Sequence, residues 1–265
     1  NKFSVGDIFV AKIRKTIPGL NAAFVNVGHE KDGFLHYHDL GPKLLSLSKF
    51  VDEIDNKKVK SFSFNKFKFE KDIPKNGLIK DCINAKQTTL VQIIKEPIST
   101  KGPRLSSEIS LAGRFMVLIP FSERISISQK IKSQDEKNRL KNLVKNIKPR
   151  GFGLIIRTVA KNKTVRELEG DLKDLILRWK RLCINFSKAD SYPTKILGEI
   201  NRTTSKLRDV FDDSFSNIYL DDPNLYSEIK EYIKVIAPGK SSIVKLYKGV
   251  TPIFEKYGIE RQIKS

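Results

Sequence analysis

Two adjacent residues, Arg157 and Thr158, end a predicted buried strand over residues 151–159 and could together bind a phosphate group. A guanidinium presents paired N–H donors that match phosphate oxygens, and a neighbouring hydroxyl adds a further donor. An Arg-Thr pair at a strand end is also common on ordinary solvated surfaces. The pair by itself therefore leaves both interpretations open.

A second candidate site lies in residues 20–36, where Phe24 and Phe34 flank a glycine-bracketed polar loop. Alternating apolar and polar residues over 7–34, with a Pro-Gly turn, predict strands of a small β-barrel. Five-stranded OB-type barrels bind single-stranded nucleic acids by stacking bases on exposed rings beside cations. Both rings could instead be ordinary core residues. The nearby cations are Lys12, Arg14, Lys15 and Lys31.

The sequence gives little support for a catalytic metal site or a catalytic nucleophile in this chain. Four aspartates could in principle hold two magnesium ions, as in nuclease sites. However, Asp222 precedes Pro223 where a helix N-cap is expected, and Asp212 and Asp213 precede Ser214 in a predicted turn, so we favour capping and turn roles. We interpret the three histidines of residues 29–38 as surface residues. The sequence contains no GxSxG, Walker loop or HExxH motif; the four aspartates are Asp212, Asp213, Asp221 and Asp222.

The charge of the chain favours a polyanionic partner. Its 265 residues include 50 Lys and Arg against 30 Asp and Glu, a formal net charge of +20. An acidic protein or an anionic membrane surface would satisfy the same charge, but no apolar run reaches the ~18 residues of a membrane span. Cys82 and Cys183 have no metal-ligand spacing, which predicts a reducing, cytoplasmic location. Because the sequence starts at Asn1 with no signal-like region, we expect it to be part of a longer protein.

The remaining elements follow from periodicity and capping signals. Residues 80–95 predict a strand that closes the barrel, 101–118 a link, and 115–120 a short apolar strand. Ser133 with Glu136, and Thr164 with Glu167, predict capping boxes at the starts of two amphipathic helices. From residue 193 we expect a helix through Ile196, Ile200 and Leu207, strands over 218–220 and 243–246, and a helix over 222–236.

Residues 57–71 combine four phenylalanines with six lysines. Their alternation with polar residues could form a strand pair or an RNA-facing arm. We favour the alternative of a loop inserted in the barrel with two partly buried rings. The phenylalanines are Phe62, Phe64, Phe67 and Phe69.

Beyond these patterns, the segment GDIFVAKIRKTIPGLNAAFVNVGHEKDGFLH closely resembles the RNA-binding OB-fold domain, of the ribosomal-protein S-one type, in the ribonuclease E/G family of bacterial endoribonucleases. The resemblance continues through KEPISTKGPRLSSEISLAGRFMVLIP, GFGLIIRTVAKNKTVRELEGDLKDLILRW and IVKLYKGVTPIFEKYGIERQIKS. It implies a multidomain α+β fold. The expected parts are an OB-fold barrel over 1–106 with a basic insertion at about 41–80, a 5′-sensor domain over 107–192 and an incomplete RNase H-like subdomain over 193–265.

The resemblance also implies roles for individual residues. Phe24, Phe34 and Lys101 match residues that contact or approach RNA, and we place Lys12 beside them. The pair Arg157 and Thr158 matches a pocket, called the 5′ sensor, that binds the 5′-monophosphate of RNA. Gly113 and Val117 match the wall against which the terminal nucleotide rests. Gln129 and Lys130 stand where some members have paired arginines, which would weaken the grip on RNA near the sensor.

The implied function is RNA recognition within a magnesium-dependent endoribonuclease that cuts single-stranded RNA in RNA processing and decay. In the family, the magnesium-binding aspartates lie in a DNase I-like domain and a zinc-binding link follows, both beyond residue 265. We therefore expect this chain to bind RNA without cleaving it, and the full-length protein to be a homo-oligomer. The alternative is a stand-alone RNA-binding protein without catalysis.

Overall fold

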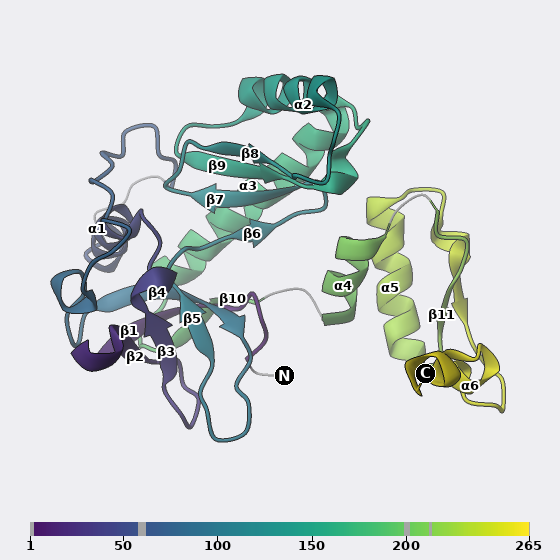
Figure 1. Ribbon diagram of the computed structural model, residues 1–265, viewed down its shortest axis with the longest axis horizontal. Helices are drawn as coiled ribbons and strands as arrows, with labels where there is room; N and C mark the ends of the chain where they lie inside the picture. Colours follow the sequence, from purple (N-terminus) through teal and green to yellow (C-terminus); the bar gives the residue numbers. More distant parts are fainter. Residues whose placement is uncertain (1–2, 58–61, 199–201, 212–213, 265) are drawn as a thin grey trace. The chain divides into compact units, whose positions relative to one another are not determined.

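The computed structural model describes residues 3–57, 62–198, 202–211 and 214–264 (Figure 1). The chain divides into two compact units, Asn1–Ile200 and Asn201–Ser265. The first unit contains a β-barrel and a four-stranded sheet, and the second contains a two-stranded sheet with helices. None of the helices in the described ranges has the length and apolar character that a membrane span requires.

Five strands close the barrel in the order β1-β2-β3-β5-β4, with β4 pairing back onto β1. This closure and the α-helix α1 (Leu44–Asp55) between β3 and β4 are consistent with an OB-fold, so the expected class of mixed fold with a five-stranded barrel is confirmed. The helix buries Leu47, Phe50 and Val51. The strands are β1 (Ile8–Ile17), β2 (Ala22–Asn26), β3 (Gly33–His36), β4 (Thr88–Lys95) and β5 (Arg104–Ser106).

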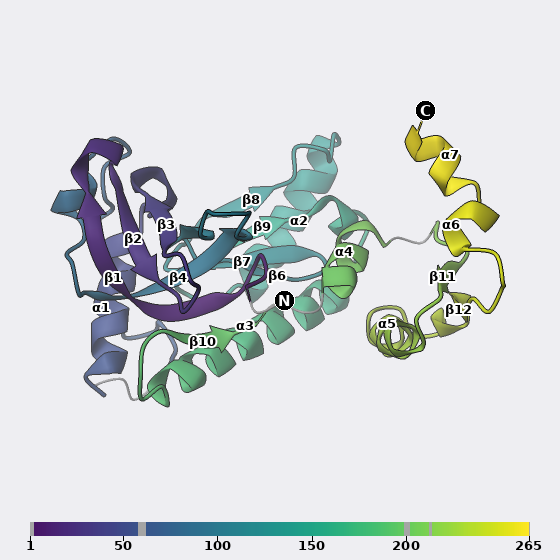
Figure 2. The same cartoon turned by 90° about the horizontal axis from the view of Figure 1, so that it is seen from below.

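Two segments near the barrel differ from the sequence prediction. Residues 104–106, expected within a link, form β5, which pairs with β3 and β4. A three-residue strand is too short to show alternation, which explains the omission. Ile196, expected in a helix, lies in β10 (Thr194–Leu197), which pairs antiparallel with β1 (Figure 2). Here hydrogen bonding to an available strand outweighs the local helical spacing.

The second part of the first unit is a sheet in the order β6-β7-β9-β8, packed with two long helices. Helix α3 begins after the predicted Thr164–Glu167 capping box, which is confirmed. At the start of α2, Ser133 accepts the Glu136 N–H, but the Glu136 carboxylate binds Arg139 and the Asn162 N–H instead of completing a box. The elements are β6 (Leu111–Ala112), β7 (Met116–Pro120), β8 (Ile125–Ile127), α2 (Gln134–Ile147), β9 (Phe152–Ile156) and α3 (Val165–Ser187).

The phenylalanines of the insertion pack inward as an aromatic cluster. Phe64 and Phe67 are buried, whereas Phe62 and Phe69 are partly buried against the same core. The ring centroid of Phe64 lies 5.8 Å from that of Trp179 and 4.9 Å from that of Phe152. The described residues 62–71 form no strand pair, and the favoured inserted loop with buried rings is confirmed; residues 58–61 lie outside the described ranges.

The second unit is built on the parallel strands β11 (Ile218–Leu220) and β12 (Val244–Leu246). Its core contains Leu207, Phe211, Ile229, Ile233 and Val244. The expected helix after Asp222 is confirmed, and Asp222 caps it by accepting the Leu225 N–H at 2.7 Å. Its helices are α4 (Arg202–Val210), α5 (Pro223–Ile236), α6 (Ile253–Lys256) and α7 (Ile259–Lys264).

Candidate nucleic-acid interface

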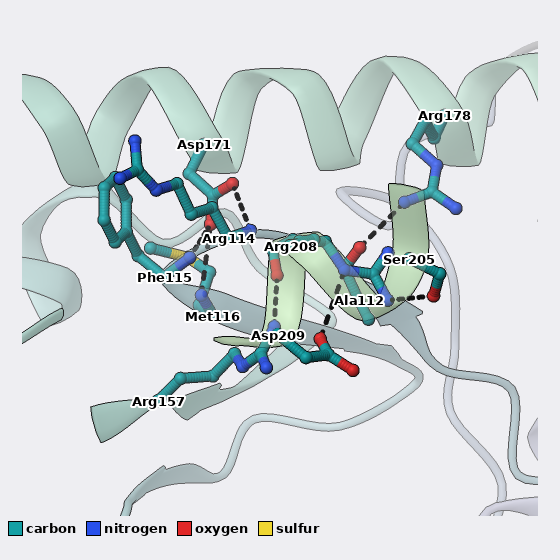
Figure 3. A network of polar contacts seen from close by, with 11 residues as sticks. Ala112, Arg114, Phe115, Met116, Arg157, Asp171, Arg178, Ser205, Arg208 and Asp209 are labelled. Atoms are coloured by element: carbon teal, nitrogen blue, oxygen red, sulfur yellow. Dashed lines mark hydrogen bonds and ion pairs between the residues drawn. The ribbon is translucent and has the colours of Figure 1, made fainter. Parts of the chain in front are cut away.

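The turn between β6 and β7 is held by one carboxylate of α3. Asp171 accepts the backbone N–H groups of Arg114 and Phe115 at 2.8 Å each and that of Met116 at 3.1 Å (Figure 3). Arg178, two turns further along α3, donates to the Ala112 carbonyl at 2.9 Å. The long helix therefore fixes the backbone on both sides of Gly113.

Burial in this turn raises the pKa of Asp171 above its ordinary value. Loss of water is the largest cause, and the three backbone N–H donors act in the opposite direction. The carboxylate accepts hydrogen bonds from the N–H groups of a tight turn. Without it, these N–H groups would be buried without partners.

Arg157 and Thr158 lie at the end of β9, beside this turn. The Arg157 N–H donates to the Phe115 carbonyl at 2.8 Å, and its Nη1 donates to the Gly113 carbonyl at 2.9 Å. The Thr158 hydroxyl lies 2.8 Å from the Ser128 hydroxyl. The structure thus brings three of the expected sensor residues together, with a half-buried guanidinium and an exposed threonine at one strand end.

Val117 and Lys130 approach the same group from neighbouring elements. Val117 lies on the outward face of β7 and pairs with Ile155 of β9, which is two positions before Arg157. Lys130 is exposed, and its backbone N–H donates to the Ser128 hydroxyl at 3.3 Å. Ser128 therefore connects the loop that carries Lys130 to Thr158.

The two barrel phenylalanines form a pair on the outer face of the barrel. Phe24 and Phe34 are cross-strand partners with ring centroids 6.0 Å apart. Their neighbours Ala23, Val25 and Leu35 point into the core, so alternation places both rings outside it, half-buried. The interpretation of Phe24 and Phe34 as plain core residues is therefore wrong.

The cations expected near these two rings differ in which ring they contact. The Lys15 ammonium is 5.7 Å from the centre of the Phe24 ring, whereas that of Lys12 is 6.0 Å from the Tyr192 ring. Lys101 is exposed in a loop whose Pro103 carbonyl accepts the Phe34 N–H at 2.8 Å. Lys15 therefore contacts the ring pair directly, whereas Lys101 lies in the exposed loop that is hydrogen-bonded to the Phe34 backbone.

No group of three or more His, Cys, Asp or Glu side chains in the described ranges could hold a metal ion. Asp222 is occupied as a helix cap, and Asp212 and Asp213 lie outside the described residues. The donor set present does not fit magnesium or zinc. The candidate site of the described residues therefore offers hydrogen-bond donors, positive charges and aromatic rings to a ligand.

Similarity to known proteins shows the family of this chain. The model of the ribonuclease E/G family matches residues 110–265. The chain belongs to the ribonuclease E/G family. Over 98% of its length it is 34% identical to Ribonuclease G of Haemophilus influenzae, 33% to the Ribonuclease E/G-like protein of Pyropia yezoensis and 30% to Ribonuclease E of a Nostoc species. It spans 49%, 47% and 34% of these three proteins, respectively.

Two residues of this ribonuclease E/G chain belong to the site but did not stand out in the sequence. Ser128 forms a hydrogen bond with Thr158, and Asp171 holds the Gly113 turn. Asp171 gave a detectable signal, because it is an acidic residue between Leu168 and Leu172 on the apolar face of α3. Ser128 gave none, since its partner is 30 residues away in the sequence.

Proposed function

We propose that this chain is the RNA-recognition part of a single-strand-specific endoribonuclease of the ribonuclease E/G type, and that it senses 5′-monophosphate ends. The observation that supports this most is the placement of Arg157 and Thr158 at one strand end beside Gly113. Hydrogen bonds to Gly113 and Ser128 restrict both side chains before any ligand arrives. Restricting them in advance lowers the entropy cost of gripping a phosphate.

In this proposal residues 107–192 form the 5′ sensor and residues 193–265 belong to an RNase H-like subdomain. Arg157 and Thr158 bind the terminal phosphate, the wall near Gly113 and Val117 receives the first nucleotide, and Lys130 adds positive charge. In this proposal these groups admit a monophosphate and exclude the bulkier triphosphate. Discrimination between the two would couple RNA decay to prior removal of pyrophosphate.

The barrel provides the second contact with RNA. Phe24 and Phe34 offer a half-buried, edge-to-face ring pair on the outer face of the barrel, on which unpaired bases can stack. Lys15, Lys12 and Lys101 supply positive charge for the backbone, in keeping with the net charge of +20. Recognition by stacking requires unpaired bases, which favours single-stranded RNA over duplex.

Cleavage in this proposal is carried out by the full-length protein. Magnesium and the structural zinc of the family would be bound outside the described residues, which lack a fitting donor set. We further propose that the full-length protein is a cytoplasmic homo-oligomer. Magnesium-dependent cleavage of RNA by the 265-residue chain would contradict the assignment of catalysis to another part of the protein.

The deciding experiment measures affinity for one short single-stranded RNA with a 5′-monophosphate, 5′-triphosphate or 5′-hydroxyl end. We expect the monophosphate to bind most tightly to the unmodified chain. Arg157→Ala and Thr158→Val should reduce this preference, while Arg166→Ala, an exposed arginine on α3, is the matched control and should preserve it. Equal affinity for all three ends would contradict sensing. It would favour the alternative of a general RNA-binding protein if RNA is still bound.

A further inference from the structure

A cavity of about 220 Å³ lies inside the first unit, between the barrel and the four-stranded sheet. The barrel contributes residues 41–43 and 107–109, and the sheet contributes the outward residues Ile119 and Ile155. Gly41 allows the two barrel segments to meet, since its φ is +72° and a Cβ there would come 2.8 Å from the Glu108 Cβ. The cavity is therefore part of how these elements pack.

The walls of the cavity combine apolar surface with one unpaired hydroxyl. Ile155 is 39% exposed although it lies on a central strand of the sheet, and Phe121 and Ile109 add apolar surface. Ser107, which also lines the cavity, is only 4% exposed, and its Oγ has no hydrogen-bond partner in the described ranges. Buried hydroxyls are normally hydrogen-bonded, and rotation of the covered Ser107 hydroxyl toward the cavity would let it pair with the polar edge of a ligand.

The rim of the cavity carries two cations and one acid. Arg124 is exposed, and none of the ion pairs within the described ranges involves it. Lys43 forms an ion pair with Asp72, with 2.5 Å between its Nζ and the Asp72 Oδ1. Glu108 is the acidic residue of the lining. Arg124 is thus the group best able to meet a phosphate at the entrance.

The cavity lies on the sheet face that carries Val117. Ile155 is the cross-strand partner of Val117 on one side and of Ser126 on the other. Val117 and Ile119 both alternate with buried residues of β7, so they share this outward face. A strand of RNA that starts at Arg157 and Thr158 and passes Val117 would reach the cavity next.

We propose that this cavity binds one unpaired nucleobase of the RNA whose 5′-phosphate is held at Arg157 and Thr158. The inference rests on the proposed 5′-end binding. The apolar walls contact the faces of the base, the Ser107 side supplies a hydrogen-bond partner for its edge, and Arg124 meets a flanking phosphate. A base combines flat apolar faces with a polar edge, which is the combination that the lining offers.

The test uses 5′-monophosphorylated RNAs in which one abasic nucleotide is moved through successive positions near the 5′ end. With the unmodified chain, we expect one position at which the missing base lowers affinity about fivefold or more, the lower range for one stacked base. Ile155→Phe, which fills the cavity, should lower affinity for intact RNA and abolish the extra loss at that position. Leu177→Phe, an exposed leucine of α3, is the matched control and should behave like the unmodified chain.

The possible results separate this inference from the proposed function. If the monophosphate preference persists but Ile155→Phe leaves the abasic profile unchanged, the cavity does not hold a base and only this inference fails. If the preference for the 5′-monophosphate is itself absent, the proposed function fails. Binding of free nucleoside monophosphates that depends on Ile155, without any position-dependent abasic effect in RNA, would also overturn the assignment to a base of the bound RNA.

Discussion

Gly113 lies so close to Asp171 that a Cβ at position 113 would come 2.6 Å from the Asp171 Oδ2 atom. The same carboxylate accepts three backbone N–H groups from the residues that follow Gly113. The carbonyl of Gly113 in turn accepts a hydrogen bond from Arg157. A missing side chain at one position therefore allows α3 to order the turn that supports the candidate phosphate-binding residue.

Gly113→Ala should disturb this arrangement. The added methyl group must displace the carboxylate, so the free energy of unfolding should fall by about 1–3 kcal/mol and the preference for 5′-monophosphorylated RNA should weaken. Gly170→Ala is the matched control, because nothing lies within 4 Å of its Cβ position. It should leave stability unchanged or raise it by about 0.5–1 kcal/mol, since alanine favours a helix interior. Chemical denaturation with RNA titration measures both effects, and equal behaviour of the two variants would contradict the role of Asp171.

Phe24→Ala and Phe34→Ala should weaken RNA binding without unfolding the barrel. Each lost ring should cost about 1–3 kcal/mol of binding free energy, because the rings lie outside the core. Phe64→Ala provides the contrast, since this ring is buried and its loss should cost about 3–5 kcal/mol of stability. If either barrel variant unfolded as readily as Phe64→Ala, the rings would have a structural role instead.

The lysines near the ring pair should differ in their effect on salt dependence. Lys15→Ala should reduce the slope of log affinity against log salt by about 0.7, the value for one phosphate contact with a single strand. Lys12→Ala should have a smaller effect, because its ammonium lies near Tyr192 instead of Phe24. Titrations at several salt concentrations measure the slopes, and a larger effect at Lys12 would place the RNA path on the Tyr192 side.

Glu136 should make the first unit sensitive to acid. Hydrogen bonds from Arg139 lower the pKa of Glu136 to about 2 from an ordinary value of 4.5. A lowered pKa in the folded state stabilises the protein above the unfolded-state value, and this stabilisation is lost as the pH falls from about 4.5 to 2. Glu136→Gln should cost about 1–3 kcal/mol at neutral pH and flatten the loss of stability in that window. Glu169→Gln, an exposed glutamate of α3, should leave the profile unchanged.

The sequence predicted those features that depend on local pattern. The strands before residue 27, the Thr164–Glu167 capping box and the helix after Asp222 all follow from spacing and cap residues within a few positions. Strand β5 and strand β10 were missed because each is three or four residues long and is stabilised by partners far along the chain. The second half of the expected Ser133–Glu136 box failed because Arg139 competes for the carboxylate.

In the candidate site, too, the sequence predicted what depends on residue type and missed what depends on distant partners. The types of Arg157, Thr158, Phe24 and Phe34 suggested phosphate and base contacts, and the structure gives each pair a shared location. Sequence alone did not show that Gly113 and Ser128 would orient the phosphate-binding pair, since those contacts cross 44 and 30 positions. It also left open which lysine approaches the rings, because the β1 register contains an irregularity between Ile13 and Lys15.

Strand β10 ties the end of the first unit to its beginning, with Leu197 opposite Ile8 in the register. Ile8 and Val10 also share one buried cluster with Leu118, Leu154 and Trp179 of the sheet and its helix. The barrel has a buried cluster of its own around Val25 and Leu35, but Ile8 and Val10 on the other face of β1 belong to the cluster that the barrel shares with the sheet. We expect it to unfold in a single cooperative transition with the four-stranded sheet, so that the two candidate RNA contacts are lost together and neither survives as an independent module.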